Sequence, residues 1–201
     1  MNCIVFHAVD LGLSVKWSTC NLGATKPEEC GDYYGWGETI GWQGMHDWSF
    51  YKWCNYGRPD CLSKYNTNSN YGGNVDNKTV LDAADDVARV KLGGTWRMPT
   101  RAECEELLKK CTWTWTTRGG VNGYKVTSKI HDNSIFLPAA GCWDGTTLYG
   151  LGESGGFWSS SLNTGCPRFA FQIGFHRDGA YGSSNGTNRY LGCSIRPVFS
   201  E

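Results

Sequence analysis

Ten cysteines and four histidines are the residues of this chain best suited to nucleophilic or metal chemistry. A thiol nucleophile needs a base within reach, and Cys166 and His176 stand ten residues apart with no local signature of such a pair. The cysteines include no CxxC spacing or other short metal-ligand pair. We therefore expect free cysteines that pack as small hydrophobic residues, and no catalytic residue, metal or cofactor.

Three other arrangements of these polar residues stay open. Cys104 and Cys111 would share one face of a helix that continued that far, and could join a zinc site. The even number of cysteines permits a disulfide framework in a secreted protein. Segment 66–77 with Asp76 could offer oxygen ligands to calcium, although it is neither an EF-hand loop nor densely acidic. The metal-free interpretation with free thiols is favoured over all three.

Paired carboxylates in the sequence also argue against an enzyme. Asp85 and Asp86, and likewise Glu105 and Glu106, are neighbours in segments with helical patterning. Adjacent residues on a helix point in different directions, so we expect solvated helix side chains and not the facing pair of a glycosidase.

Charge and composition exclude two classes of partner. The net charge is zero, with 19 basic and 19 acidic residues and no long basic run, which argues against nucleic acid. No stretch approaches the roughly 20 apolar residues that span a bilayer, and the start lacks the basic and apolar regions of a signal peptide. The 27 glycines, ten Trp and ten Tyr indicate a loop-rich protein with short strands.

Two helices are expected in the middle of the chain. Segment 79–90 has apolar residues at helical spacing, acids in its early turns and two glycines after its end. A second helix, 101 to about 110, follows Pro99 and opens with Thr100 and Glu103, the signature of a capping box.

Strand patterns surround these helices. We expect one or two short strands in 11–39, an antiparallel meander over 112–116, 124–127 and 134–137, and a last strand at 193–198. The clearest alternation is in 168–176, which predicts one core face and one exposed face. The core face would carry Phe169, Phe171, Ile173 and Phe175.

Segment 41–77 has no periodicity and is long for a loop, so we expect an ordered insertion held by Trp48, Tyr51 and Trp53. The order of elements predicts an α+β fold in which two helices pack on short antiparallel strands, as a single domain over 1–201.

Exposed positions in the last third differ in kind from the core positions. The apolar positions are uniform and large, whereas the outward positions are chemically mixed and include His176, Tyr181 and Tyr190. Binding surfaces favour such a mixture, because aromatic rings give contact area at low entropic cost. On composition alone, a binding surface and a merely solvated surface are equally supported.

Several strings of the sequence resemble one known family. They are VDLGLSVKW (9–17), GDYYGWGE (31–38), YKWC (51–54), TWRMPT (95–100), CTWTWT (111–116), NSIFLPAAG (133–141), FWSSSLNT (157–164) and SIRPV (194–198). Together they are similar to the Fibrobacter succinogenes major paralogous domain, found in proteins of gut Bacteroidales and their phages. The resemblance covers about residues 9–198.

This resemblance implies a C-type-lectin-like fold of the branch that contains formylglycine-generating enzymes. Those enzymes share a helix start that corresponds here to Arg97, Pro99, Thr100 and Glu103. It further implies that Trp96 and Arg97 are structural, and that the chain ends meet on one side of the fold.

Some members of the family are variable proteins of diversity-generating retroelements, in which chosen codons are mutated at adenines. The resemblance thus implies a variable region at about 156–198, although strand alternation places one of its positions, Phe169, inward. The candidate positions are Cys166, Arg168, Phe169, Gln172, Gly174, His176, Gly179, Tyr181, Ser183, Ser184, Tyr190, Leu191 and Cys193.

The leading hypothesis is a variable ligand-binding protein, associated with a cell surface or a virion, that engages a protein or glycan on a host or neighbouring cell. A second is an adhesin or structural module without variability. A third, from fold analogy alone, is a sulfatase-modifying type of enzyme. The calcium-binding motifs of sugar-binding lectins are absent, and Cys166 and Cys193 are 27 residues apart, unlike the closely spaced cysteines of those enzymes.

Overall fold

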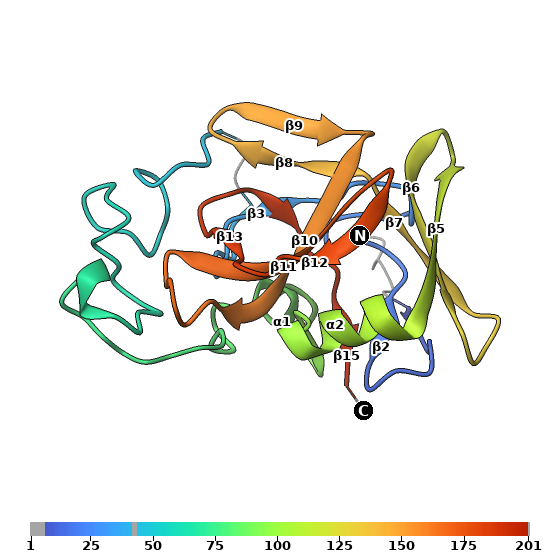
Figure 1. Cartoon of the computed structure of the whole chain (residues 1–201), viewed down its shortest axis with the longest axis horizontal. Helices are drawn as coiled ribbons and strands as arrows, with labels where there is room; N and C mark the ends of the chain where they lie inside the picture. Colours follow the sequence, from blue (N-terminus) through green and yellow to red (C-terminus); the bar gives the residue numbers. More distant parts are fainter. Residues whose placement is uncertain (1–6, 42–43, 201) are drawn as a thin grey trace.

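The computed structural model describes residues 7–41 and 44–200, and within them the chain is an α+β protein (Figure 1). These residues form the helices α1 (Val87–Leu92) and α2 (Arg101–Lys110), the 3-10 turn η1 (Ser69–Tyr71), and many short strands that pair mostly antiparallel. None of their sheets closes into a barrel. Cys3 with the rest of the first six residues, and residues 42–43 of the expected insertion, lie outside the described residues.

The candidate region forms most of the largest sheet, whose strand order is β12-β11-β10-β14-β3, with β13 paired to β11. Strand β10 pairs antiparallel with β11 and parallel with β14. The bounds are β3 (Tyr33–Tyr34), β10 (Ser154–Leu162), β11 (Phe169–His176), β12 (Gly179–Gly182), β13 (Thr187–Asn188) and β14 (Cys193–Ser194).

A second sheet joins the two ends of the described chain. Its order is β1 (Ala8–Val9), β2 (Lys16–Ser18), β15 (Val198–Phe199) and β4 (Trp96–Arg97). The expected meander is confirmed as β5 (Cys111–Arg118), β6 (Val121–Ser128) and β7 (Ser134–Pro138), and a separate hairpin follows, made of β8 (Ala140–Asp144) and β9 (Thr147–Leu151).

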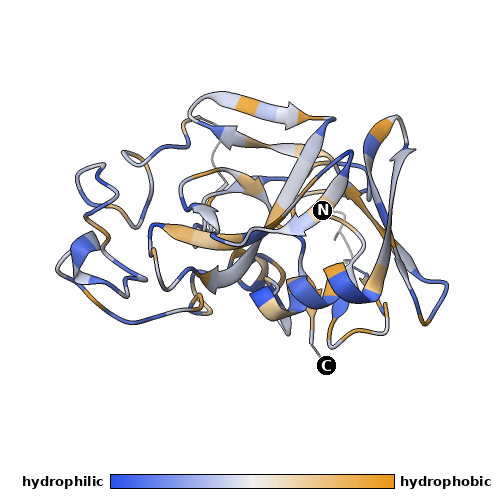
Figure 2. Cartoon of the chain, viewed as in Figure 1, coloured by the Kyte–Doolittle hydropathy of each residue, from blue (hydrophilic) through white to orange (hydrophobic). Residues whose placement is uncertain are grey.

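Strand β10 separates two hydrophobic clusters, because consecutive residues of a strand point to opposite faces. Phe157 packs in one cluster with Ile173 and with Leu107 of α2. Trp158, the next residue, packs in the other cluster with Val87 of α1. Figure 2 shows hydrophilic residues along α2, whose few apolar side chains turn toward the first cluster. The central strands are therefore held from both sides.

Helix α2 begins and ends where the sequence predicts. The Thr100 hydroxyl accepts from the Glu103 amide, and the Glu103 carboxylate accepts from the Thr100 amide at 2.7 Å, so the capping box is present. Arg97 also donates to Glu103, at 2.8 Å and 2.5 Å. Arg97 is thus part of the structural frame, and Trp96 stacks edge-on against Phe199 with ring centroids 5.2 Å apart.

The first helix is shorter than its pattern predicts, since α1 starts at Val87 and not near residue 79. Asp86 acts as its N-cap, and the same carboxylate accepts from the Met98 amide at 2.9 Å. Asp85 accepts from the Tyr65 hydroxyl at 2.6 Å. Both aspartates are buried, so the expectation of solvated helix residues is wrong for them. Contacts with distant segments, and not helical propensity, decide their positions.

Residues 44–77 of the expected insertion pack against neighbouring segments of the chain. Tyr51 is buried and donates to the Trp36 carbonyl at 2.6 Å, while Trp53 donates to the Gly37 carbonyl at 3.1 Å. A further anchor, missed in the sequence, is Arg189, whose fully buried guanidinium lies beside the Trp36 ring. Its nitrogens donate to the Tyr51 hydroxyl and to the carbonyls of Lys64, Tyr65 and Pro167, at 2.8 to 3.1 Å.

The predicted alternation of buried and exposed side chains in β11 is confirmed for only part of the strand. Ile173 and Phe175 are fully buried, but Phe169 and Phe171 are only half-buried. Ala170, expected to face outward, is also fully buried, in the second cluster. Pairing with β10 is irregular between Trp158 and Leu162, and the second cluster covers the face that was expected to be exposed.

Candidate functional site

The hairpin of β11 and β12 carries the most exposed of the candidate positions. His176 pairs with Gly179 across a two-residue turn, and Gly174 pairs with Tyr181. The rings of His176 and Tyr181 lie 5.7 Å apart, and both side chains are exposed. The pair thus offers an aromatic and polar surface on a hairpin whose other side faces the core.

Tyr181 is held over a glycine. A Cβ atom at Gly174 would lie 2.9 Å from the Tyr181 ring, so the absence of a side chain there lets the ring approach the sheet closely. Gly174 is buried as a result. The expectation that this position is exposed is wrong, and its role is to seat Tyr181.

A groove of about 330 Å³ lies between the hairpin and α2. Gln172, Ser183 and Ser184 line it from the candidate positions, and Arg101 and Phe171 are also in its wall. The Arg101 guanidinium lies 3.8 Å from the centre of the Phe171 ring. This half-buried phenylalanine therefore gives the groove an apolar surface with a cation above it.

Four more candidate positions lie in two other places. Cys166 contacts the Tyr71 hydroxyl at 3.3 Å, a hydrogen bond that raises the pKa of that tyrosine, and Arg168 lies over the Phe169 ring. Tyr190 packs edge-on against Trp48 of the insertion, with ring centroids 5.2 Å apart. These residues are only partly exposed, so they extend the surface of the hairpin less than expected.

Cys193 does not belong to an exposed surface. It is 1% exposed, and burial raises the pKa of its thiol well above the ordinary value. Its Sγ atom lies 2.9 Å from Sγ of Cys142 and 3.4 Å from Oε1 of Gln172. The expected exposure of Cys193 is wrong because β8 and β14 cover each other here. Leu191 is likewise packed against the second cluster.

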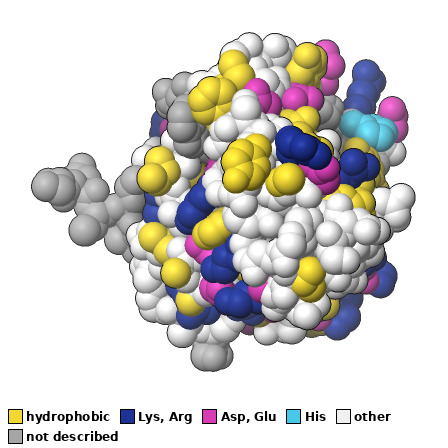
Figure 3. All heavy atoms as spheres, turned by 90° about the vertical axis from the view of Figure 1, so that its left-hand side faces the viewer, with side chains coloured by type: hydrophobic (Ala, Val, Ile, Leu, Met, Phe, Trp, Pro, Cys, Tyr) yellow, Lys and Arg dark blue, Asp and Glu magenta, His cyan; other side chains and the backbone are white. Residues whose placement is uncertain are grey.

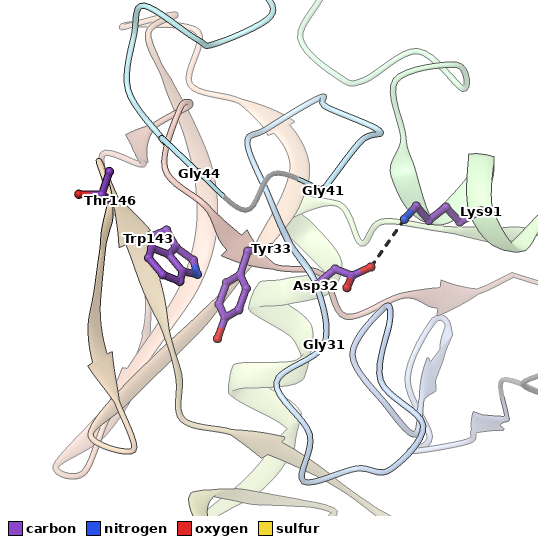
Figure 4. Close-up of a pocket in the computed structure, with 8 residues that line it drawn as sticks. All are labelled: Gly31, Asp32, Tyr33, Gly41, Gly44, Lys91, Trp143 and Thr146. Atoms are coloured by element: carbon purple, nitrogen blue, oxygen red, sulfur yellow. Dashed lines mark ion pairs between the residues drawn. The ribbon is translucent and has the colours of Figure 1, made fainter.

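A separate cavity of about 480 Å³ opens beside β3 and β8, and no sequence pattern predicts it (Figure 4). Tyr33 and Trp143 form one wall, with their rings edge-on at 6.3 Å. On the other side, Lys91 of α1 forms an ion pair with Asp32 at 3.6 Å. The cavity has the aromatic and polar lining of a small-molecule pocket, but it includes none of the candidate positions.

The other residues singled out for chemistry have structural partners. Cys166 and His176 lie against different neighbours, Tyr71 and Tyr181, and do not form a nucleophile and base pair. The Asp76 carboxylate accepts from backbone amides of its own loop. Glu105 pairs with basic residues of α2.

Over residues 7–41 and 44–200, no group of three or more His, Cys, Asp or Glu side chains is arranged to hold a metal ion. No helix in the same residues is long and apolar enough to cross a membrane. Figure 3 shows hydrophobic, basic and acidic side chains interspersed on the described part of the face that carries the insertion.

Comparison of the chain with models of protein families, with curated proteins and with solved structures finds no match in any of the three. The similarity of the sequence strings to the major paralogous domain therefore rests on those strings alone.

Proposed function

We propose that this chain is a ligand-binding display protein with a C-type-lectin-like scaffold, which engages a protein or glycan on a cell surface through the β11–β12 hairpin and its adjoining groove. One observation carries the proposal. His176 and Tyr181 project from a hairpin on which Ile173 and Phe175 are fully buried. Mixed polar and aromatic groups thus stand on a rigid support, as a binding surface requires.

Three features support the lectin-like part of the proposal. The fold is α+β with short antiparallel strands. The ends of the described chain meet in one sheet, through β1, β2 and β15. The helix start of the resembled family has a structural counterpart in the Arg97 and Glu103 ion pair.

Binding energy would concentrate at Tyr181. Interfaces draw most of their affinity from a few aromatic or arginine anchors, and Tyr181 is half exposed while its ring is already fixed over Gly174. Little side-chain entropy would be lost when such a ring is covered. His176 adds a polar edge beside it. The groove at Phe171 opens on the opposite, α2-facing side of the hairpin, so a ligand would reach it only by extending around β12.

The test is binding of the purified chain to an array of glycans and surface proteins of host and neighbouring cells. Tyr181→Ala should weaken binding at least tenfold, about 1.4 kcal/mol. Tyr149→Ala is the matched control, because Tyr149 on β9 is 60% exposed against 50% for Tyr181. Equal loss, or no loss, in the two variants would show that the hairpin is not the binding surface.

The proposal includes diversification of the candidate positions by a retroelement. Its rival is a fixed adhesin or structural module of a surface or virion protein, in which the same hairpin mediates constant contacts. The sequences of independent isolates distinguish the two. Exchange at His176, Tyr181 and Ser184 beside constant Ile173 and Phe175 supports diversification, whereas unchanged residues at all these positions support the fixed module.

An enzyme of the sulfatase-modifying type has the least support. Cys166 contacts Tyr71, whereas Cys193 is buried against Cys142, so these two cysteines have different surroundings. Replacement of both Cys166 and Cys193 by serine, with no loss of any measured oxidation, would end that hypothesis.

A further inference from the structure

Cys142 and Cys193 face each other across two antiparallel segments. The neighbouring residues, Trp143 and Gly192, exchange both backbone hydrogen bonds, at 2.9 Å and 3.0 Å. In an antiparallel ladder, the next pair of residues after a hydrogen-bonded pair has no backbone hydrogen bonds between its two members. Its Cα atoms are about 4.5 Å apart, and its side chains lie closer together than those of a hydrogen-bonded pair. Cys142 and Cys193 occupy this position of the ladder. Its spacing falls within the range of about 4.4–6.8 Å that a disulfide bridges.

The side chains point toward each other, as the ladder requires. Their Sγ atoms are 2.9 Å apart. Cys193 is buried and Cys142 is half-buried, so solvent reaches the pair from the side of β8. Tyr33 and Trp143, which Figure 4 shows side by side, lie next to them. The pair thus lies behind the aromatic wall of the larger cavity.

We propose that Cys142 and Cys193 are a cross-linking site, which a disulfide oxidant such as oxidised glutathione converts to an intramolecular disulfide that fastens β14 to β8. The thiolate of the more accessible Cys142 attacks the oxidant, which forms a mixed disulfide and releases one reduced glutathione. The sulfur of Cys193 then attacks Sγ of Cys142 and expels the second glutathione, whose departing thiolate takes up the proton of the Cys193 thiol. Two protein thiols are oxidised and one glutathione disulfide is reduced.

The cross-link does not depend on the proposed ligand-binding function, but it would act on the same region. It closes a loop across 51 positions that contains β10, β11 and β12, and so includes the whole hairpin. Cys142 lies before the candidate variable region, whereas Cys193 is one of its positions. Under diversification, only chains that carry cysteine at position 193 would be cross-linked.

The test is to treat the folded chain with oxidised glutathione, alkylate it under denaturing conditions and map its peptides without reduction. We expect one peptide pair joining Cys142 to Cys193, about 2 Da lighter than the reduced pair, that disappears on reduction. Alkylation of both cysteines after oxidation, or exclusive linkage of either one to a different cysteine, would overturn the proposal.

A second measurement compares melting temperatures of the oxidised and reduced chain. Because the closed loop is long, oxidation should raise Tm by on the order of 10 °C. In Cys142→Ser this increment should vanish, whereas in the control Cys166→Ser, which removes another half-buried thiol, it should remain. An equal increment in Cys142→Ser would also overturn the proposal. If Cys142→Ser does not fold, the peptide map of the unaltered chain decides alone.

Discussion

Replacement of Arg189 by alanine should be among the most destabilising single changes in this chain. The guanidinium is fully buried and binds four acceptors, which are the Tyr51 hydroxyl and the carbonyls of Lys64, Tyr65 and Pro167. Three of these belong to the expected insertion, and the fourth lies just before β11. Arg189 therefore ties the insertion to the candidate region.

The size of the effect follows from these contacts. A hydrogen bond from a charged donor contributes about 1.5–3 kcal/mol, but removal of Arg189 also relieves the cost of burying its charge. A net loss of about 1 kcal/mol for each of the four bonds gives about 4 kcal/mol in the free energy of unfolding. For a chain of this size, that lowers Tm by about 8–16 °C. Arg189→Lys should recover part of the loss, because a single ammonium cannot span all four acceptors.

Urea unfolding monitored by circular dichroism measures this difference. Arg177→Ala is the control, since Arg177 is exposed in the turn of the hairpin and its removal should change the free energy of unfolding by less than about 0.5 kcal/mol. Hydrogen exchange should also show faster opening of residues 44–77 in Arg189→Ala. If Arg189→Ala is as stable as Arg177→Ala, the reasoning from buried hydrogen bonds is refuted.

Two further predictions concern the start of α2. Thr100→Ala removes the acceptor for the Glu103 amide and should lower the free energy of unfolding by about 1 kcal/mol. Thr100→Ser keeps a hydroxyl acceptor and should retain most of that stability. Equal stability of the two variants in chemical unfolding would contradict the capping role. Burial raises the pKa of the Glu103 carboxyl, but hydrogen bonds from Arg97 and the Thr100 amide outweigh burial and leave that pKa below its ordinary value. Its stabilisation is therefore present above about pH 4.3, the unfolded value, and is lost as pH falls through the lower folded pKa. Urea unfolding at pH 6 and pH 3 should show that the stability gap between the unaltered chain and Glu103→Gln narrows at pH 3, and a gap that widens there would contradict the sign.

The parts of the fold that the sequence predicts are those with local causes. The capping box of Thr100 and Glu103 is complete within four residues, so α2 is found with its correct bounds. The start of α1 is different, because Asp82, Asp85 and Asp86 all have the side chain of an N-cap. The contact of Asp86 with the Met98 amide selects among them, and no local pattern records it.

The candidate surface also contains positions that local sequence predicts and positions that depend on distant segments. Strand alternation and turn residues predict the exposure of His176 and Tyr181, which depends only on their own hairpin. The burial of Cys193 depends on β8, about 50 residues earlier, and the role of Arg189 depends on the insertion. A contact between segments that are distant in the sequence leaves no periodic trace in either one.

The sequence of the genomic locus that encodes this chain tests most directly whether a constant scaffold carries exposed residues that a retroelement exchanges. The account predicts a nearby reverse transcriptase gene and a second, nearly identical copy of the segment encoding residues 156–198. The differences between the copies should fall at adenines of that second copy, in codons of exposed positions such as His176, Tyr181 and Ser184, and should spare Ile173 and Phe175. A locus with neither the reverse transcriptase nor the adenine-differing repeat would contradict the exchangeable face.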